Sequence, residues 1–490
     1  MHHDNLADFH PQTILQDWGD GDAFRLADAG TGVCIFGATG SGKTSGPAKH
    51  LAYSYLAADF GGLVLCAKQE ERFQWEQWAA ETGRTDDLVI VDGQGQWRYN
   101  FMDWEAARPG EGGGLTINIV AILSQIATAV SGRTAKVSAG GDRFWDDALA
   151  HMLTNLVDLP LFAGLRISLP LLRSIMNSAP LTALQTEDED WHEKSVCAIT
   201  LHEGDEATVK GDADIRADFE ECQTYWLREY PALSEKTRSI VDLTFSMLLR
   251  PFVTRPLRKL FCTDTNIKPE DAFAGKIIIV DLPIQEYRLV GKIANLAWKF
   301  CFQLAVLRRM PPEGGFMRPV FLWADEAQNF VTDFDAEYQA VARSAGGCTV
   351  YITQSRESLR RVLGNDDAVD SLLGNLQAKF FCQNSGGTND WAAKLLGEHW
   401  LHVTSTNVAR GSNDGTQQAA GQESRSAAVS RKEERRRFIE PSRFTTLKRG
   451  GQQNDYLVEA IVYNGGNQFL DPAGGHGEIL PHKLLTFRQR

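Results

Sequence analysis

Short apolar segments that end in polar residues recur along this chain and predict buried β-strands. They cover residues 32–36, 63–67, 88–91, 276–280, 320–324, 349–352 and 378–382. Helical patterns lie between most of them. Strands that alternate with helices are typical of a parallel sheet with both faces covered, so the pattern predicts an α/β fold with a parallel-rich sheet.

The spacing of apolar residues changes in the middle of the chain. Residues 141–266 carry Leu, Ala, Met and Trp at helical intervals and few strand-like runs, which predicts a mostly helical domain inserted between two parts of the core, 1–140 and 267–400. Inside the insertion, residues 187–221 are strongly acidic. A solvated surface is the simpler interpretation, and docking of a partner is the alternative.

Composition changes again after Trp400. Residues 401–440 are rich in Ser, Gly, Gln and Asn and then basic, which predicts a linker or mobile loop. The basic run at 431–437 fits a solvated helical face, although contacts with nucleic-acid phosphates are an alternative. Residues 441–490 form a C-terminal segment that returns to the core, with one further strand over 456–463.

Composition limits the class of protein. The chain has 490 residues, 43% of them hydrophobic and 23% charged, and a net charge of -13, so we expect a folded protein that does not coat nucleic acid over its whole surface. Eight cysteines are scattered without a C-x-x-C pair, which favours a reducing compartment. We find neither a secretory signal nor a run long enough to span a bilayer, and we expect a cytoplasmic location.

The most specific motif is GATGSGKTSG, which directly follows the first predicted strand. It matches the phosphate-binding pattern G-x-x-x-x-G-K-[ST] at Gly37, Gly42, Lys43 and Thr44. Glycines allow backbone N–H groups to point at phosphate oxygens, the lysine reaches the terminal phosphates, and the threonine hydroxyl binds Mg²⁺. The predicted cofactors are ATP and Mg²⁺, and the predicted nucleotide-binding residues are Gly37, Thr39, Gly40, Ser41, Gly42, Lys43, Thr44 and Ser45.

Three predicted strands end in aspartate, at Asp92, Asp281 and Asp325. Only Asp325 is followed by a second carboxylate, Glu326. That pair supplies one group to position Mg²⁺ and an adjacent one to activate the attacking water. Asp325 is therefore the predicted metal ligand with Thr44, while the other two aspartates fit strand-end caps or groups at a switch point of the sheet.

A third element lies after the following strand, in CTVYITQS. Gln354 lies just past the strand in this segment, one helix and one strand beyond the acidic pair, which places an amide near the terminal phosphate. We predict that Gln354 senses this phosphate and couples hydrolysis to motion. Glu326, Lys43 and Gln354 are the predicted catalytic residues.

In this order, GATGSGKTSG, GKIIIVDLP, FLWADEAQNF and ARSAGGCTVYITQS resemble the type IV secretion coupling proteins of conjugation, the TraG/TraD-like members of the FtsK/HerA group. The resemblance covers most of the chain, from about residue 17 to residue 400. It implies a RecA-like motor domain interrupted by an all-helical domain. It also implies a homo-oligomeric ring, with a hexamer as one candidate size, that uses ATP to move DNA or a nucleoprotein substrate through its pore.

The same resemblance implies a basic residue supplied by the neighbouring subunit of the ring, which would stabilise charge on the transferred phosphate. Lys379 lies nearest to the position that the family would use. The other candidates are Arg343, Arg356, Arg360 and Arg361. Family members usually begin with transmembrane helices, and this chain is predicted to lack one. Either a membrane or secretion-channel partner tethers it in trans, or the motor serves another DNA task.

Two other functions share the phosphate loop. A nucleotide-gated module, for example in a defence or secretion complex, would use ATP to order a partner interface and hydrolyse it slowly or incidentally. A small-molecule kinase would need neither the acidic pair nor the large helical insertion, and it fits the sequence less well.

Overall fold

The computed structural model describes residues 9–131, 141–410, 425–470 and 479–489. A nine-stranded sheet forms its centre, in the order β15-β12-β9-β3-β8-β7-β4-β6-β5. Seven neighbouring strands run parallel: β3 (Val33–Phe36), β4 (Gly61–Leu65), β5 (Leu88–Val91), β6 (Ile277–Val280), β7 (Val320–Ala324), β8 (Gly347–Thr353) and β9 (Ala378–Phe381). The predicted α/β fold is confirmed, and each predicted strand of the parallel sheet is present.

Alternation along β3 shows why these strands form the interior. Its four residues are all fully buried. Val33 and Ile35 join the hydrophobic cluster on one face of the sheet, while Cys34 and Phe36 join the cluster on the other. Successive side chains of a strand point to opposite faces, so a strand covered on both sides needs an unbroken apolar run.

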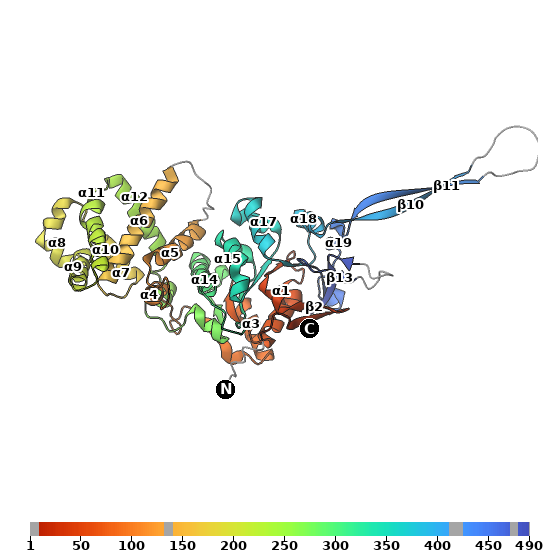
Figure 1. Ribbon diagram of the computed structural model, residues 1–490, viewed down its shortest axis with the longest axis horizontal. Coiled ribbons are helices and arrows are strands. Elements are labelled where there is room, and N and C mark those ends of the chain that lie inside the picture. Colours follow the sequence, from red (N-terminus) through yellow and green to blue (C-terminus); the bar gives the residue numbers. More distant parts are fainter. Residues whose placement is uncertain (1–8, 132–140, 411–424, 471–478, 490) are drawn as a thin grey trace, which may run out of the picture.

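Helices cover both faces of the sheet (Figure 1). One face carries α1 (Leu26–Gly30), α2 (Lys49–Ala57) and α3 (Glu70–Glu81), together with the hairpin of β1 (Ile14–Gly19) and β2 (Asp22–Arg25). The other face carries α14 (Ile284–Leu307), α15 (Phe334–Ala342), α16 (Arg356–Leu363), α17 (Asp366–Asn375), α18 (Gly387–Leu396) and α19 (Pro441–Thr445).

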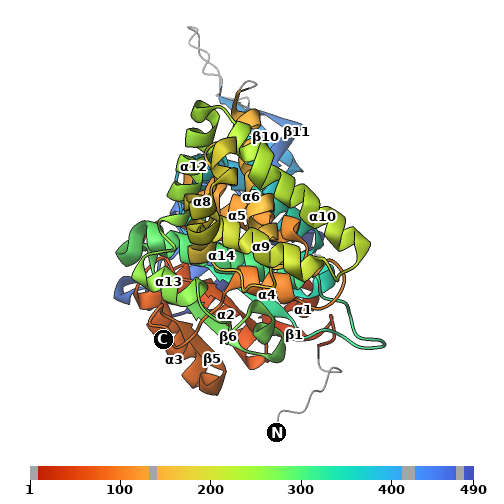
Figure 2. The same cartoon turned by 90° about the vertical axis from the view of Figure 1, so that its left-hand side faces the viewer.

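A helical domain extends from one end of the sheet (Figures 1 and 2). It consists of α4 (Phe101–Ala107), α5 (Thr116–Ser131), α6 (Gly141–Phe162), α7 (Leu169–Asn177), α8 (Glu189–Lys194), α9 (Val196–Thr208), α10 (Ala213–Thr224), α11 (Tyr230–Ala232), α12 (Glu235–Leu249) and α13 (Arg255–Phe261). The helices begin before residue 141, the predicted start of the insertion. Helix α5 packs on α14, and a single hydrophobic cluster runs from the domain into the sheet.

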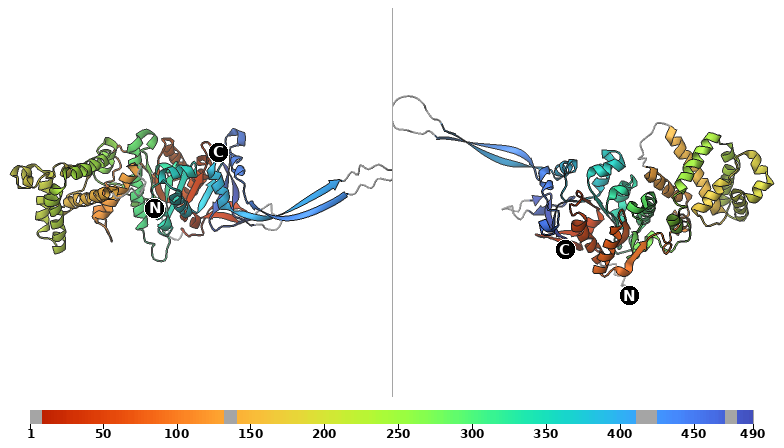
Figure 3. Two further views of the ribbon diagram at one scale, coloured as in Figure 1. Left: turned by 90° about the horizontal axis from the view of Figure 1, so that it is seen from above. Right: turned by 180° about the vertical axis from the view of Figure 1, so that it is seen from behind.

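Beyond Trp400 the structure differs from the prediction of a linker or mobile loop over 401–440. Strands β10 (Glu398–Arg410) and β11 (Arg425–Arg437) pair antiparallel along their whole length and form a ribbon that projects away from the body (Figures 1 and 3). The prediction is wrong for the residues in these strands, and so is the helical face predicted over 431–437. Residues 411–424 lie outside the described residues. Polar composition concealed the ribbon because strands without a buried face need no apolar alternation.

The C-terminal segment completes the sheet. Strand β12 (Leu457–Asn464) lies antiparallel to β9, and β15 (Lys483–Arg488) lies antiparallel to β12 at the edge. A small hairpin of β13 (Phe469–Leu470) and β14 (Ile479–Leu480) forms a separate sheet, and Phe469 packs in the core beside Trp18. The strand predicted over 456–463 is thus present, and it closes the side of the sheet next to the phosphate loop.

Helix α14 is the one described helix whose length and apolar composition would allow it to span a membrane. Most of its apolar window, 78%, is buried inside the protein. A helix packed in a protein core passes the same test of length and composition, and α14 packs against β4, β6 and α5.

Candidate functional site

The phosphate loop lies at the carboxyl edge of the parallel strands, between β3 and a tight helical turn, Thr44–Ala48. Neighbouring strands hold its entry, because Gly37 N–H donates to Thr353 O at 3.2 Å and Ala38 N–H donates to Gln383 O at 3.0 Å. Gly42 has a positive φ of 83°. Residues with a side chain rarely adopt this conformation, so the turn depends on glycine.

The loop has the features of a phosphate cradle. A Cβ atom on Gly37 would overlap the hydroxyl of Ser41, so this position has no room for a side chain. The Ser41 hydroxyl is fully buried and has no hydrogen-bond partner among the described residues. Thr39 and Gly40 form the exposed tip. An orphaned buried hydroxyl beside an open glycine turn fits a bound phosphate group.

The C-terminal segment packs against this loop. The sequence analysis did not predict this contact. A Cβ on Gly42 would lie 2.5 Å from Val458 of β12, and one on Gly46 would lie 2.9 Å from the same side chain. The side chain of Gln489 donates to Ser45 Oγ at 2.6 Å. More than 400 residues separate these partners in sequence, and no local motif marks the contact.

The predicted metal ligands lie together. Thr44 Oγ1 donates to Asp325 Oδ2 at 2.7 Å, although the two residues are 281 positions apart. Asp325 directly follows β7 and is 3% exposed. Mg²⁺ in nucleotide sites typically takes one or two protein oxygens and completes its shell with phosphates and water. The described residues contain no cluster of three or more His, Cys, Asp or Glu side chains that could hold a metal alone.

Glu326 stands beside this pair in an unusual backbone conformation, with φ 50° and ψ 47°. Its Oε1 lies 2.9 Å from Lys68 Nζ and 3.9 Å from Lys43 Nζ. Its Oε2 accepts hydrogen bonds from Gln328 at 2.8 Å and from Gln354 at 3.2 Å. Residues held in the left-handed region by their surroundings often lie at functional sites.

Opposing effects set the ionisation of Glu326. Burial alone would raise the pKa of this carboxyl group, but the hydrogen bonds from Gln328 and Lys68 and the charges of Lys43 and Lys68 lower the pKa below its usual value. The group is therefore an ionised carboxylate whose two oxygens are both occupied by donors.

Lys68 and Gln328 are the partners that sequence reasoning did not identify. Lys68 follows β4, which neighbours β7 in the sheet, so the parallel order brings it to the same edge as Glu326. Gln328 follows the acidic pair by two residues, and its amide oxygen accepts from Thr353 Oγ1 at 2.9 Å. The signal for Lys68 was its position directly after an apolar strand, but strand order cannot be derived from spacing alone.

Asp92 and Asp281 do not join this group. The carboxylate of Asp92 caps the N–H of Gln94 at 2.9 Å, and Asp281 forms an ion pair with Arg72 at 2.8 Å. Both occur at the same edge of the sheet, where β5 and β6 end, and both satisfy local partners.

The candidates for a residue acting on a neighbouring subunit differ in accessibility. Lys379 is 3% exposed, and its ammonium donates to Leu376 O at 2.6 Å, so burial opposes the role that the family resemblance gave it. Arg356 forms ion pairs with Asp366 and Asp370. Exposed candidates are Arg343, Arg360 and Arg361.

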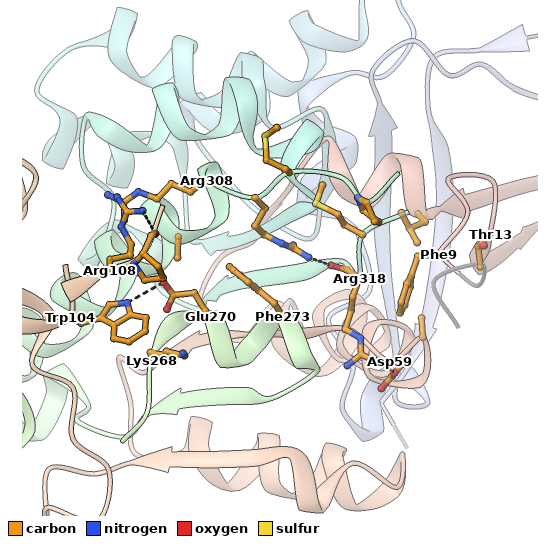
Figure 4. A pocket seen from close by; sticks show the side chains of 18 of the residues that line it. Phe9, Thr13, Asp59, Trp104, Arg108, Lys268, Glu270, Phe273, Arg308 and Arg318 are labelled. Carbon is orange, nitrogen blue, oxygen red and sulfur yellow. Dashed lines mark hydrogen bonds and ion pairs between the residues drawn. The ribbon is translucent and has the colours of Figure 1, made fainter. Parts of the chain in front are cut away.

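A larger cavity, about 810 Å³, lies at the opposite edge of the sheet and contains none of the predicted site residues. Figure 4 shows Trp104, Lys268 and Glu270 toward one end of it and Phe9 and Asp59 toward the other. Its walls carry five basic side chains, Arg108, Lys268, Arg308, Arg309 and Arg318. Partners hold most of them: Arg308 forms a bidentate pair with Glu105 at 2.7 and 2.8 Å.

Comparison with known proteins agrees with this architecture. Residues 319–449 match the family model described as the TraM recognition site of TraD and TraG. A search of curated proteins gives no match. Among solved structures, the chain is similar to the unbound bacterial conjugative coupling protein TrwBdeltaN70, with a TM-score of 0.60 and 17% identity over 98% of this chain and 89% of that one.

Two nucleotide complexes of the same coupling protein give similar values. The complex of TrwB with the ATP analogue ADPNP has a TM-score of 0.58 and 16% identity, over 98% of this chain and 90% of that one. The complex with ADP and Mg²⁺ has a TM-score of 0.59 and 16% identity, over 98% and 89%. The chain thus combines a TraG/TraD C-terminal family segment with the fold of a conjugative coupling protein, which confirms the family resemblance seen in the sequence.

Proposed function

We propose that this protein is a substrate-coupling ATPase of the conjugative or type IV secretion type, which assembles into a ring and translocates DNA or a nucleoprotein substrate. The observation that carries the proposal is the convergence at one sheet edge of Thr44, Asp325 and Glu326, with Thr44 and Asp325 only 2.7 Å apart. TrwB, whose fold this chain shares, has been solved with an ATP analogue and with ADP and Mg²⁺.

The residues divide the work in the following way. Backbone N–H groups of the glycine loop and the ammonium of Lys43 would hold the phosphates, while Thr44 and Asp325 would hold Mg²⁺. Mg²⁺ would neutralise developing negative charge on the phosphate oxygens.

Glu326 accepts the proton of the water whose oxygen bonds to the terminal phosphorus. The bridging P–O bond breaks in the same reaction, and its electron pair leaves with the diphosphate. Gln354 contacts Glu326 at 3.2 Å and reports the state of the site to α16, which begins two residues later.

Partner recognition belongs to the same proposal. The segment that matches the TraM recognition model begins just before β7 and includes the acidic pair, Gln354 and β10 with β11. A partner docked on the part of this segment that carries the acidic pair and Gln354 would lie beside the hydrolysis site. In this proposal the chain works on the cytoplasmic side, and a membrane or secretion-channel partner recruits it in trans.

The decisive experiment compares two variants of the full chain. For a motor, Lys43→Ala loses nucleotide binding, while Glu326→Gln binds ATP but loses DNA-stimulated hydrolysis, by about a hundredfold or more. Negative-stain images with a slowly hydrolysed ATP analogue should show rings. Undiminished hydrolysis in Glu326→Gln would refute the assignment of the base.

A nucleotide-gated module is the second candidate, because three hydrogen-bond donors and the nearby charge of Lys43 hold Glu326, and such a carboxylate suits slow turnover. This function predicts that Glu326→Gln keeps partner binding, that Lys43→Ala abolishes it, and that the protein stays monomeric with the analogue.

A further inference from the structure

The carboxylate of Glu326 is engaged through both of its oxygens in this structure. One oxygen contacts the ammonium groups of Lys68 and Lys43, and the other accepts from the amides of Gln328 and Gln354. A general base must lie within hydrogen-bond distance of the water it activates, on a lone pair that no other donor uses. Lys68 is the hydrogen-bond donor on Oε1, since Lys43 Nζ lies 3.9 Å away, so departure of the Lys68 ammonium would leave this oxygen open to water.

Lys68 is the donor most able to leave. Its side chain is 34% exposed, whereas that of Lys43 is 8% exposed. Lys68 also makes the shortest contact between a cation and Glu326, at 2.9 Å. Its backbone belongs to a firmly held turn after β4, where Asn295 accepts from Cys66 N–H at 2.9 Å and Glu71 accepts from Ala67 N–H at 2.7 Å. The turn is fixed, so the ammonium moves by rotation of the side chain alone.

An open cleft of about 470 Å³ lies on the outer side of Lys68. Its lining includes Lys68, Glu70, Gln285, Arg288, Glu326 and Asn329. Backbone hydrogen bonds tie its two walls together, because Gln285 N–H donates to Ala67 O at 3.0 Å. The cleft and the hydrolysis site therefore share Glu326 and Lys68.

Arg288 is the second cation of this cleft. It interrupts α14 with φ 50° and ψ -122°, a strained conformation for a residue with a side chain. The side chain is exposed, and within the described residues no carboxylate pairs with it. An exposed guanidinium without a carboxylate partner is available to an anion, and its planar fork fits the oxygens of a phosphate.

We propose that this cleft receives a phosphodiester group of the polymer that the protein moves, and that this anion draws Lys68 away from Glu326 and so releases the base. The inference rests on the proposed function and adds a site and a trigger to it. Arg288 supplies a positive charge without an ion-pair partner beside Lys68, on a cleft whose lining also includes the carboxylate of Glu70. Lys68 exchanges one anionic partner for another, so the switch needs little net change in electrostatic energy.

This arrangement makes hydrolysis conditional on substrate. Without polymer, Lys68 stays on Glu326 and ATP turns over slowly. When a phosphodiester occupies the cleft, one oxygen of Glu326 becomes free to accept a proton from water. Lys68 is thus a positioning residue that acts through Glu326 and does not touch the reacting atoms.

The test measures ATP turnover of the full chain with and without a single-stranded oligodeoxynucleotide. We call the ion pair between Lys68 and Glu326 the latch. The Lys68→Met variant, which lacks the latch, should hydrolyse ATP about tenfold faster without oligonucleotide, the scale of one charge-assisted hydrogen bond. The oligonucleotide should then stimulate its hydrolysis hardly at all. Lys68→Arg keeps the ion pair and should restore both values. Arg288→Gln should raise the oligonucleotide concentration needed for half-maximal stimulation about tenfold. Lys210→Met, at an exposed lysine of the helical domain, is the matched control and should behave as the unaltered protein.

Several results would overturn the inference. If Lys68→Met lowers both rates in proportion, Lys68 serves the chemistry directly. If this variant keeps its stimulation, the latch does not exist, and if polyglutamate stimulates as strongly as the oligonucleotide, the cleft does not select phosphodiesters. Failure of the proposed function has a different signature, because the unaltered protein would then show no hydrolysis that Lys43→Ala abolishes.

Discussion

The two edges of the central sheet show how differently a protein can arrange charge. At the carboxyl edge, side chains from four parallel strands converge on one carboxylate, Glu326, which has a positive φ. At the amino edge, a larger cavity carries five basic side chains. There, Arg308 is clamped to Glu105, and Arg309 donates to the backbone oxygens of Ala345 and Arg318.

The two edges differ in how their charged and polar groups are paired. At the amino edge, most cations are neutralised or held by backbone oxygens, as expected for a junction between the helical domain and the core. At the carboxyl edge, Ser41 Oγ is buried without a partner, and Arg288 is exposed without a carboxylate among the described residues. At the amino edge, Glu270 Oε2 is also buried without a partner, so the approach of Thr44 to Asp325 beside the glycine loop marks the functional edge better than cavity volume or a single orphaned atom does.

The largest expected effect comes from filling the glycine loop. In Gly42→Ala, the new methyl group would lie 2.5 Å from Val458 and 3.0 Å from Arg449 O, at a φ of 83°. Strain and overpacking together should lower the free energy of unfolding by about 2–4 kcal/mol. Nucleotide binding should be lost as well, as measured by titration with a fluorescent ATP analogue.

Two glycines provide controls for this comparison of edges. Gly40, in the same loop, and Gly110, near the amino-edge cavity, have φ values of 74° and 94°, and a Cβ on either would meet nothing within 4 Å. In their alanine variants, the free energy of unfolding should fall by only about 1 kcal/mol. Equal damage in all three would show that backbone conformation, and not contact with β12, limits the loop.

A smaller effect is expected at the amino edge. Glu105 is 3% exposed and accepts from Arg308, while Arg108 Nε lies 3.3 Å away. Glu105→Gln would weaken both contacts and should lower the free energy of unfolding by about 1–3 kcal/mol in urea titrations. The Kd for ATP should not change. A large loss of nucleotide affinity would mean that the two edges are coupled, and that the amino edge is not purely structural.

The sequence predicted the parallel strands and the residues of the carboxyl edge, because apolar runs and phosphate-loop spacing are local signals. Gly37 to Thr44 and Asp325 with Glu326 could be placed in this way. Lys68 could not, since its role depends on β4 lying beside β7. The contacts of the C-terminal segment could not be predicted for the same reason. Val458 lies beside the loop only because β12 is placed close to β3 in the strand order.

The ribbon of β10 and β11 escaped prediction for a different reason. An isolated two-stranded ribbon buries little apolar surface, so nothing in the sequence has to alternate. The basic run that ends β11 was misread as helical because charge spacing carries little information on backbone conformation. Burial of Lys379 was equally invisible, because a single lysine in an apolar strand resembles an exposed one.

Lys379 offers the finest test of the difference between the two edges. Its ammonium points toward Leu376 O, which precedes β9, and lies over the Tyr463 ring at 5.5 Å, away from the nucleotide loop. Burial lowers the pKa of Lys379 from 10.5 to about 8. The unfolded chain therefore binds more protons than the folded one between pH 8 and 10.5, and the free energy of unfolding should rise across this window.

In Lys379→Met, that rise should disappear. Burial of the charge costs about 3 kcal/mol at neutral pH, and loss of the bond to Leu376 O offsets part of the gain, so the variant should be more stable at pH 7 by about 1–2 kcal/mol. Urea titrations at pH 7 and pH 10 measure both changes. ATP hydrolysis in the assembled protein should persist. If Lys379→Met folds stably yet loses hydrolysis only in the oligomer, this lysine acts on the neighbouring subunit. A purely structural role for Lys379 would then be wrong.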